Sequence, residues 1–132
     1  MSVDHHIDDE AKVIITSLNG DAIDSELVEI LTNYFRDIKS QSRYEAYNEI
    51  IDLRNVHGFK LEPQKIRELA TISSSYDKDG INTKLAIIAS SILAFGLAKI
   101  YEIARKIDRK SCKEVRVFKR LSDAHEWLGL PP

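Results

Sequence analysis

The segment TKLAIIAS, residues 83–90, restricts the possible folds most because it is almost entirely apolar. A strand with one wet face alternates polar and apolar residues, whereas a continuous apolar run indicates cover on both faces. The segment therefore predicts an interior strand of a parallel sheet. A helical pattern follows from residue 91 to about residue 107. Five of its residues are spaced to share one face, which we expect to be buried: Ile92, Gly96, Ile100, Ile103 and Ile107.

The rest of the chain alternates strand-like and helix-like segments. Further strands are expected at residues 3–8, 12–18, 46–53 and 114–120, and further helices at residues 23–38, from Pro63 onward and from Ser122 onward. Asn19-Gly20 indicates a turn, and the first two strands are expected to form an antiparallel hairpin. This order predicts an α/β fold: a single domain over residues 1–132, with a mostly parallel five-stranded sheet, an antiparallel N-terminal strand and about four helices.

Composition excludes several classes of function. The formal net charge is −2, and no recognition module or interleaved aromatic pattern indicates nucleic-acid binding. Cys112 is the only cysteine, so neither an intrachain disulfide nor a site built of cysteines alone is possible, and we expect an inert thiol. No glycine-rich phosphate loop occurs and no cofactor is expected. The acidic N-terminus is unlike a signal peptide, so we expect a cytoplasmic protein.

Three stretches carry a family resemblance. NEIIDLRNV, KLAIIASSILAFGLAKIYEIA and VRVFKRLSDAHEWLG, in this order, resemble the SpoIIAA-like family of the STAS superfamily, which has the fold of anti-sigma-factor antagonists. The likeness extends from about Lys12 to Gly129. The resemblance implies a STAS-like α/β domain that binds a partner or ligand and is not an enzyme.

The resemblance also identifies a position that regulates related proteins. In phosphoregulated STAS domains, the loop after the equivalent of residues 49–53 carries a serine at the start of the next helix. A kinase partner phosphorylates that serine, and the added charge breaks the partner complex. This chain has no serine or threonine between Arg54 and Ala70. We therefore expect no phosphorylation switch at the usual position.

Related folds of the lipid-transfer class hold apolar ligands beside the sheet, and this likeness implies the leading hypothesis. We expect reversible binding of a small apolar or amphipathic, lipid-like molecule. The residues expected near it are His57, Phe59, Leu61, Ser91, Phe95 and Tyr101. The alternative is a STAS-type protein-interaction module that uses Lys60 and Glu62 in the loop.

A basic surface and a histidine complete the candidate residues. The surface consists of Lys99, Lys106, Arg109 and Lys110, which either contact anionic lipid headgroups or form an ordinary wet face. Peripheral membrane contact and homo-oligomer formation both remain open. His57 is an ordinary loop histidine or, less favoured, an acid–base group, because the sequence places no serine, cysteine or aspartate partner beside it. Ser91 is equally explained as a helix cap.

Overall fold

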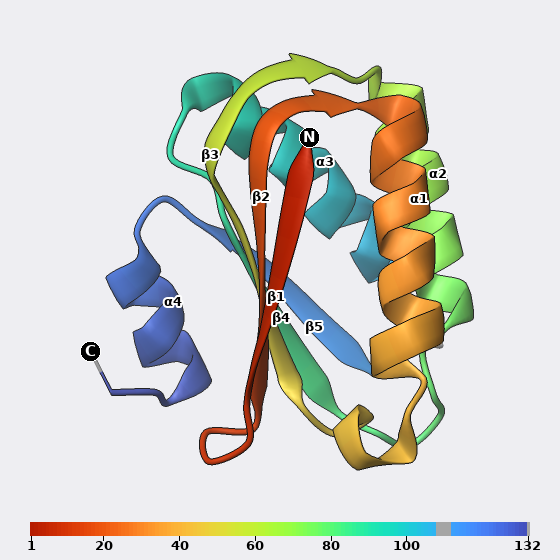
Figure 1. The fold of residues 1–132 in the computed structure, drawn as a ribbon, viewed down its shortest axis with the longest axis vertical. Coiled ribbons are helices and arrows are strands. Elements are labelled where there is room, and N and C mark those ends of the chain that lie inside the picture. Colours follow the sequence, from red (N-terminus) through yellow and green to blue (C-terminus); the bar gives the residue numbers. More distant parts are fainter. Residues whose placement is uncertain (108–111, 132) are drawn as a thin grey trace.

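The computed structural model describes residues 1–107 and 112–131 and shows a five-stranded sheet covered by helices (Figure 1). In chain order the elements are β1 (Ser2–Asp8), β2 (Val13–Ile23), α1 (Asp24–Tyr34), β3 (Asn48–Lys60), α2 (Pro63–Ser75), β4 (Thr83–Ile88), α3 (Ile92–Ile107), β5 (Lys113–Phe118) and α4 (Leu121–Leu128). A π-helical turn, Phe35–Lys39, and a 3-10 turn, Ser42–Tyr44, follow α1. The predicted α/β class is confirmed.

The strands lie side by side in the order in which the chain makes them. The sheet order is β1-β2-β3-β4-β5, with β1 antiparallel to β2 and every other neighbouring pair parallel. Helices α1, α2 and α3 cover one face, and α4 covers the other (Figure 1). The predicted parallel sheet and its antiparallel N-terminal strand are therefore both correct.

Alternating side chains of the strands form separate cores on the two faces. In β4, Leu85 and Ile87 pack with α3 residues such as Ala94, while Ala86 and Ile88 pack with Ala124 of α4. Because β4 is interior and both of its faces are covered, each of its positions from 85 to 88 is buried. This arrangement is what its uninterrupted apolar sequence predicts.

Two strands are longer than the sequence pattern predicts. The expected turn at Asn19-Gly20 and the expected loop around Gly58 are both wrong, because β2 and β3 continue and pair with each other there. Phe59 pairs with Ala22, and the two strands arch over the end of the sheet toward α1 and α2 (Figure 1). A Cβ on Gly58 would lie 2.8 Å from Asp21 Oδ1, so glycine permits this close approach. Register shifts in β2 accompany the bend.

Helix α3 is rotated relative to the sequence-based expectation. Ile92 is 95% exposed, Ile107 is 75% exposed, and Gly96 and Ile103 also face solvent, so the predicted buried isoleucine stripe is wrong. The face against the sheet instead carries Ala94, Ala98, Glu102 and Arg105. Small alanine side chains let the helix backbone approach the sheet more closely than isoleucines would allow.

The two charged residues on this inner face are both partnered. Glu102 Oε1 accepts a hydrogen bond of 3.1 Å from the Val117 N–H, which satisfies a donor on the edge strand β5. Arg105 donates two bonds to the Asp77 carboxylate, at 2.9 and 3.0 Å, and one to Ser74 Oγ at 2.7 Å. Burial of these charges is tolerated because each meets an acceptor or donor at the interface.

Isoleucine-to-alanine substitutions at the end of β4 and at the start of α3 test the orientation of α3. Ile88→Ala empties a fully buried site and should lower the free energy of unfolding by about 2–5 kcal/mol. Ile92→Ala, four residues later and 95% exposed, should change it by less than about 0.5 kcal/mol. Chemical denaturation of both variants measures the difference. A large loss for Ile92→Ala would mean that the isoleucine stripe is buried after all.

Candidate functional site

An apolar cavity lies between the sheet and helices α1, α2 and α3. It is a cavity of about 90 Å³. Its walls are formed by Thr16, Leu18, Leu27, Ile30, Leu31, Ile51, Leu53, Leu61, Ile66, Leu69, Ile87, Ala94, Leu97, Ala98 and Tyr101. Apolar spaces of this kind accept small apolar molecules.

The walls of the cavity differ in how well they are packed. Leu69, Ala94 and Ala98, from α2 and α3, are buried. Leu27 and Ile30, from α1, are only partly buried although they line the same space. The side chains from α1 are therefore among the less buried parts of the wall.

The six residues predicted to contact a ligand are divided between the cavity and the surface. Leu61 and Tyr101 line the cavity. Phe59 and Phe95 pack against the surrounding core but form no part of the wall. Ser91 caps α3, since its hydroxyl accepts a 3.1 Å bond from the Ala94 N–H. This capping role is the alternative that the sequence left open for the serine.

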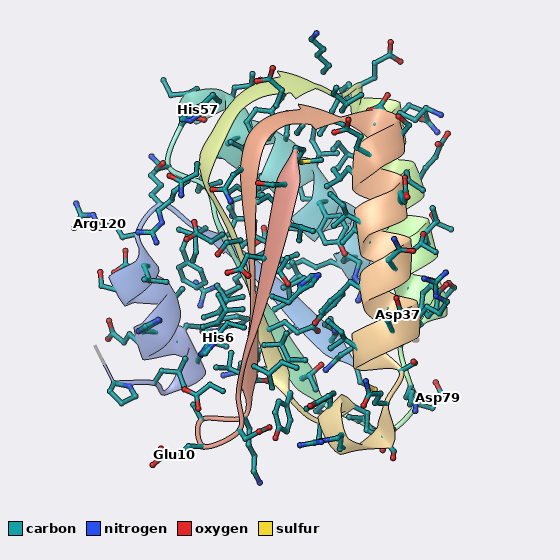
Figure 2. The ribbon with its side chains drawn as sticks, viewed as in Figure 1. His6, Glu10, Asp37, His57, Asp79 and Arg120 are labelled. Carbon is teal, nitrogen blue, oxygen red and sulfur yellow. The ribbon has the colours of Figure 1, made fainter. Side chains whose placement is uncertain are left out.

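His57, the remaining residue of that group, is exposed on β3 and does not lie in a loop. Figure 2 shows it at the arched end of the sheet, far from His6 and at the opposite end from Glu10. Among residues 1–107 and 112–131, no side-chain hydrogen bond or ion pair involves His57, and no three histidine, cysteine, aspartate or glutamate side chains are placed to hold a metal. The structure therefore assembles no acid–base pair around this histidine.

The predicted partner-facing residues lie on two separate surfaces. Lys60 ends β3 and Glu62 precedes α2, and both are exposed. Lys99 and Lys106 lie on α3, where each pairs with the Glu102 carboxylate, at 3.1 and 3.9 Å. Arg109 and Lys110 lie outside the described residues. None of the described helices is long and apolar enough to cross a membrane.

A buried charge cluster lies on the same face of the sheet, next to the cavity. Glu49 of β3 accepts a 2.7 Å bond from the Tyr34 hydroxyl, and its other oxygen pairs with the Lys113 ammonium and lies 3.8 Å from Lys39. Burial opposes ionisation of Glu49, but the charges of Lys113 and Lys39 and these hydrogen bonds outweigh it, so the pKa of Glu49 is lowered. Burial beside this carboxylate raises the pKa of Tyr34.

Lys39 is held as an anchor within this cluster. Burial lowers its pKa to about 8, although the Glu49 carboxylate opposes the shift. Its ammonium donates bonds of 2.7, 3.0 and 3.3 Å to the backbone carbonyls of Tyr47, Tyr44 and Glu45. A lysine nucleophile needs a free lone pair directed at open space. Lys39 instead fastens the chain after α1 to the sheet.

Most cavity residues were missed by the sequence analysis, although a helical signal for them exists. Ala94, Leu97, Ala98 and Tyr101 follow the spacing i, i+3, i+4, i+7 on α3. This pattern is weaker than the isoleucine stripe because two of its members are alanines. The wall from α1 is detectable too, since Leu27, Ile30 and Leu31 belong to the apolar face predicted for residues 23–38.

The fold defines the class of this protein as an α/β domain with the SpoIIAA-like arrangement, as the resemblance in the sequence predicts. No protein-family model and no curated protein matches the sequence. A crystal structure of an uncharacterized DUF3478-family protein from Shewanella loihica PV-4, described as having a SpoIIAA-like fold, is similar to this chain. The likeness covers 96% of this chain and 92% of that chain, with a TM-score of 0.54 and 16% sequence identity.

Neutralising the buried carboxylate should expose its contribution to stability. Glu49→Gln removes the carboxylate charge that faces Lys113 and Lys39, and it should lower the free energy of unfolding by about 3–5 kcal/mol. The pKa of Glu49 is lowered in the fold from its ordinary 4.5. Its stabilisation is thus complete above about pH 4.5 and is lost as pH falls through the lower, folded pKa.

Urea denaturation between pH 3 and pH 7 measures both effects, with Glu114→Gln as the control. Glu114 is exposed on β5, so its substitution should change neither the stability nor its acid dependence. If Glu49→Gln kept the full acid-dependent loss seen in the unchanged protein, another carboxylate would be responsible for it.

Proposed function

We propose that this protein is a non-enzymatic binding domain that reversibly holds a small apolar or amphipathic molecule in the cavity between its helices and its sheet. The observation that carries the proposal is the enclosed, almost wholly apolar wall, to which α1, α2, α3 and the sheet all contribute. Ligand pockets are mainly apolar, with few polar groups that fix orientation. The absence of a polar partner for His57 within the described residues supports a binding role over an enzymatic one.

The size of the cavity limits the ligand. In another protein, an engineered apolar cavity of about 150 Å³ binds benzene. The cavity here is about 90 Å³, so it accommodates a short chain, or one ring with a small outward movement of α1. A long lipid would occupy the cavity with only part of its chain.

Native mass spectrometry of freshly purified protein, followed by organic extraction, tests for a bound molecule. We expect a discrete additional mass that partitions into the organic phase. We also expect toluene, added to the emptied protein, to shift amide NMR signals of residues around the cavity. The proposal fails if no mass is carried and toluene shifts nothing.

A cavity-filling substitution locates the binding event. Ala98→Leu projects from α3 into the cavity and should weaken toluene binding by more than about tenfold, while stability is kept or raised because the empty space is filled. Ala104→Leu is the matched control, since Ala104 is on the same helix but outside the cavity wall. Equal toluene affinities in the two variants would place the binding site elsewhere.

The exposed face of α3 favours contact with an anionic membrane surface as part of this function. The face is formed by Ile92, Leu93, Ile103 and Ile107, all more than half exposed, with Lys99 and Lys106 beside them. A helix that joins an apolar face to lysines suits the boundary between headgroups and acyl chains, where apolar burial and charge attraction both contribute. A protein carrying an apolar ligand would exchange it at such a surface.

Sedimentation with vesicles tests this contact. The protein should bind vesicles of phosphatidylglycerol and phosphatidylcholine, more weakly as salt rises, and Ile103→Asn with Ile107→Asn should reduce binding by about tenfold or more. Val3→Asn, at an exposed apolar position on β1, is the control. If the unchanged protein stays in the supernatant, membrane contact is excluded.

Capture of a stoichiometric partner through Lys60 and Glu62 would then favour the STAS-type interaction module.

A further inference from the structure

The cavity wall has two ends of different chemistry. Of its lining residues, only Thr16 and Tyr101 carry a polar side-chain atom. The strand register places Thr16, Ile51 and Ile87 in one row across the sheet, with Leu18 and Leu53 farther along the same strands. The row on the other side of Thr16 contains Ile14 and Glu49. Thr16 therefore lies at the end of the cavity nearest the buried charge cluster.

Tyr101 belongs to the same end. Its neighbour Glu102 accepts a bond from the Val117 N–H, and Val117 lies in the same row of the sheet as Thr16. Burial raises the pKa of Tyr101, although the charge of Arg105 opposes this shift, so the hydroxyl stays protonated. The nearby Ser73 hydroxyl donates its proton to the Leu69 carbonyl, at 2.8 Å. A phenolic oxygen carries lone pairs that accept a hydrogen bond, so Tyr101 can be the acceptor for a ligand hydroxyl.

Thr16 can supply the complementary proton. Its hydroxyl lies 2.8 Å from His5 Nδ1 on β1. Burial lowers the pKa of His5, so the imidazole is neutral near pH 7 and either of its nitrogens can carry the proton. With the proton on Nδ1, His5 donates to Thr16, and the threonine proton is free to point into the cavity. Thr16 and Tyr101 then form a donor and an acceptor at one end of an apolar space.

We propose that Thr16 and Tyr101 select a neutral ligand that carries one hydroxyl group, in preference to the hydrocarbon or the carboxylate of the same shape. A ligand hydroxyl donates to the Tyr101 oxygen and accepts from Thr16, while the apolar body lies toward Leu18 and Leu53. A carboxylate has no proton to donate to Tyr101, and burying its charge in an apolar cavity is unfavourable. The inference rests on the proposed function of the cavity as a ligand site.

Two pairs of isosteric probes test this selection. In a wholly apolar cavity, toluene binds more tightly than phenol, because an unpaired buried hydroxyl is unfavourable. We expect phenol to bind this protein at least as tightly as toluene, as measured by NMR titration near pH 7. Nitrobenzene and benzoate are also close in shape, and benzoate should bind at least about a hundredfold more weakly than nitrobenzene.

Substitutions assign the effect to the two hydroxyls. In Thr16→Val and in Tyr101→Phe, phenol affinity should fall about tenfold relative to toluene affinity, and in the double variant further, since each removes one hydrogen bond without changing shape. Thr83→Val is the control, because Thr83 is equally buried but outside this cavity. Continued toluene binding shows that each variant is folded and its cavity intact.

The outcomes separate the two ideas. If neither toluene nor phenol binds, the cavity is not a ligand site and the proposed function itself is overturned. If toluene binds and phenol is excluded, the cavity holds ligands but the assignment of Thr16 and Tyr101 is wrong. The assignment is also wrong if benzoate matches nitrobenzene, or if the variants leave the ratio of phenol to toluene affinity unchanged.

Discussion

The close packing of α3 on the sheet through Ala94 and Ala98 determines where the other features of the molecule lie. Two alanines bring the helix backbone near β4 and β5, and they are too small to fill the space beside them. The cavity is the unfilled remainder. The same rotation turns Ile92 and Ile107 toward solvent, because a helix that buries one side must expose the opposite side. Cavity and exposed apolar face thus have one common cause.

Charged side chains hold this packing in place. Glu102 and Arg105 lie on the buried side of α3, where Glu102 bonds the edge strand β5 and Arg105 pairs with Asp77 in the chain after α2. Glu49 also holds elements together on this face of the sheet, because it joins Tyr34 and Lys113, which come from segments distant in sequence. Such groups add little net stability, yet each is strongly destabilising if left unpaired. They therefore favour one orientation of the helix over its alternatives.

The sequence was sufficient for the fold because strand and helix periodicities are repeated along the whole chain. Continuous apolar residues in β4 correctly indicated an interior strand, and the alternating apolar residues of β5 are typical of the edge strand that it forms. The rotation of α3 could not be predicted in the same way. Its isoleucine stripe is more hydrophobic than its alanine stripe, and the partners that permit burial of Glu102 and Arg105 come from elsewhere in the fold. Hydrophobicity alone therefore selects the wrong face.

The candidate site was predicted only in part for a related reason. Leu61 was found because it follows a segment that carries the family resemblance, and Tyr101 because it lies within one, whereas Thr16 gave no signal within its own strand. Its significance depends on two contacts across space, one with His5 on β1 and one with the cavity. Phe59 and Phe95 satisfied the expectation of large apolar contacts but serve the surrounding core.

The segment between β3 and α2 differs in kind from the loop of phosphoregulated STAS domains. A phosphorylation switch needs a hydroxyl on a segment that a kinase can extend and that a charge can displace. Here residues 54–60 contain no hydroxyl side chain, and most of them are fixed by pairing with β2. The next residue, Leu61, turns its side chain into the cavity wall. Under the proposed function, this segment encloses the ligand site instead of presenting a hydroxyl for phosphorylation.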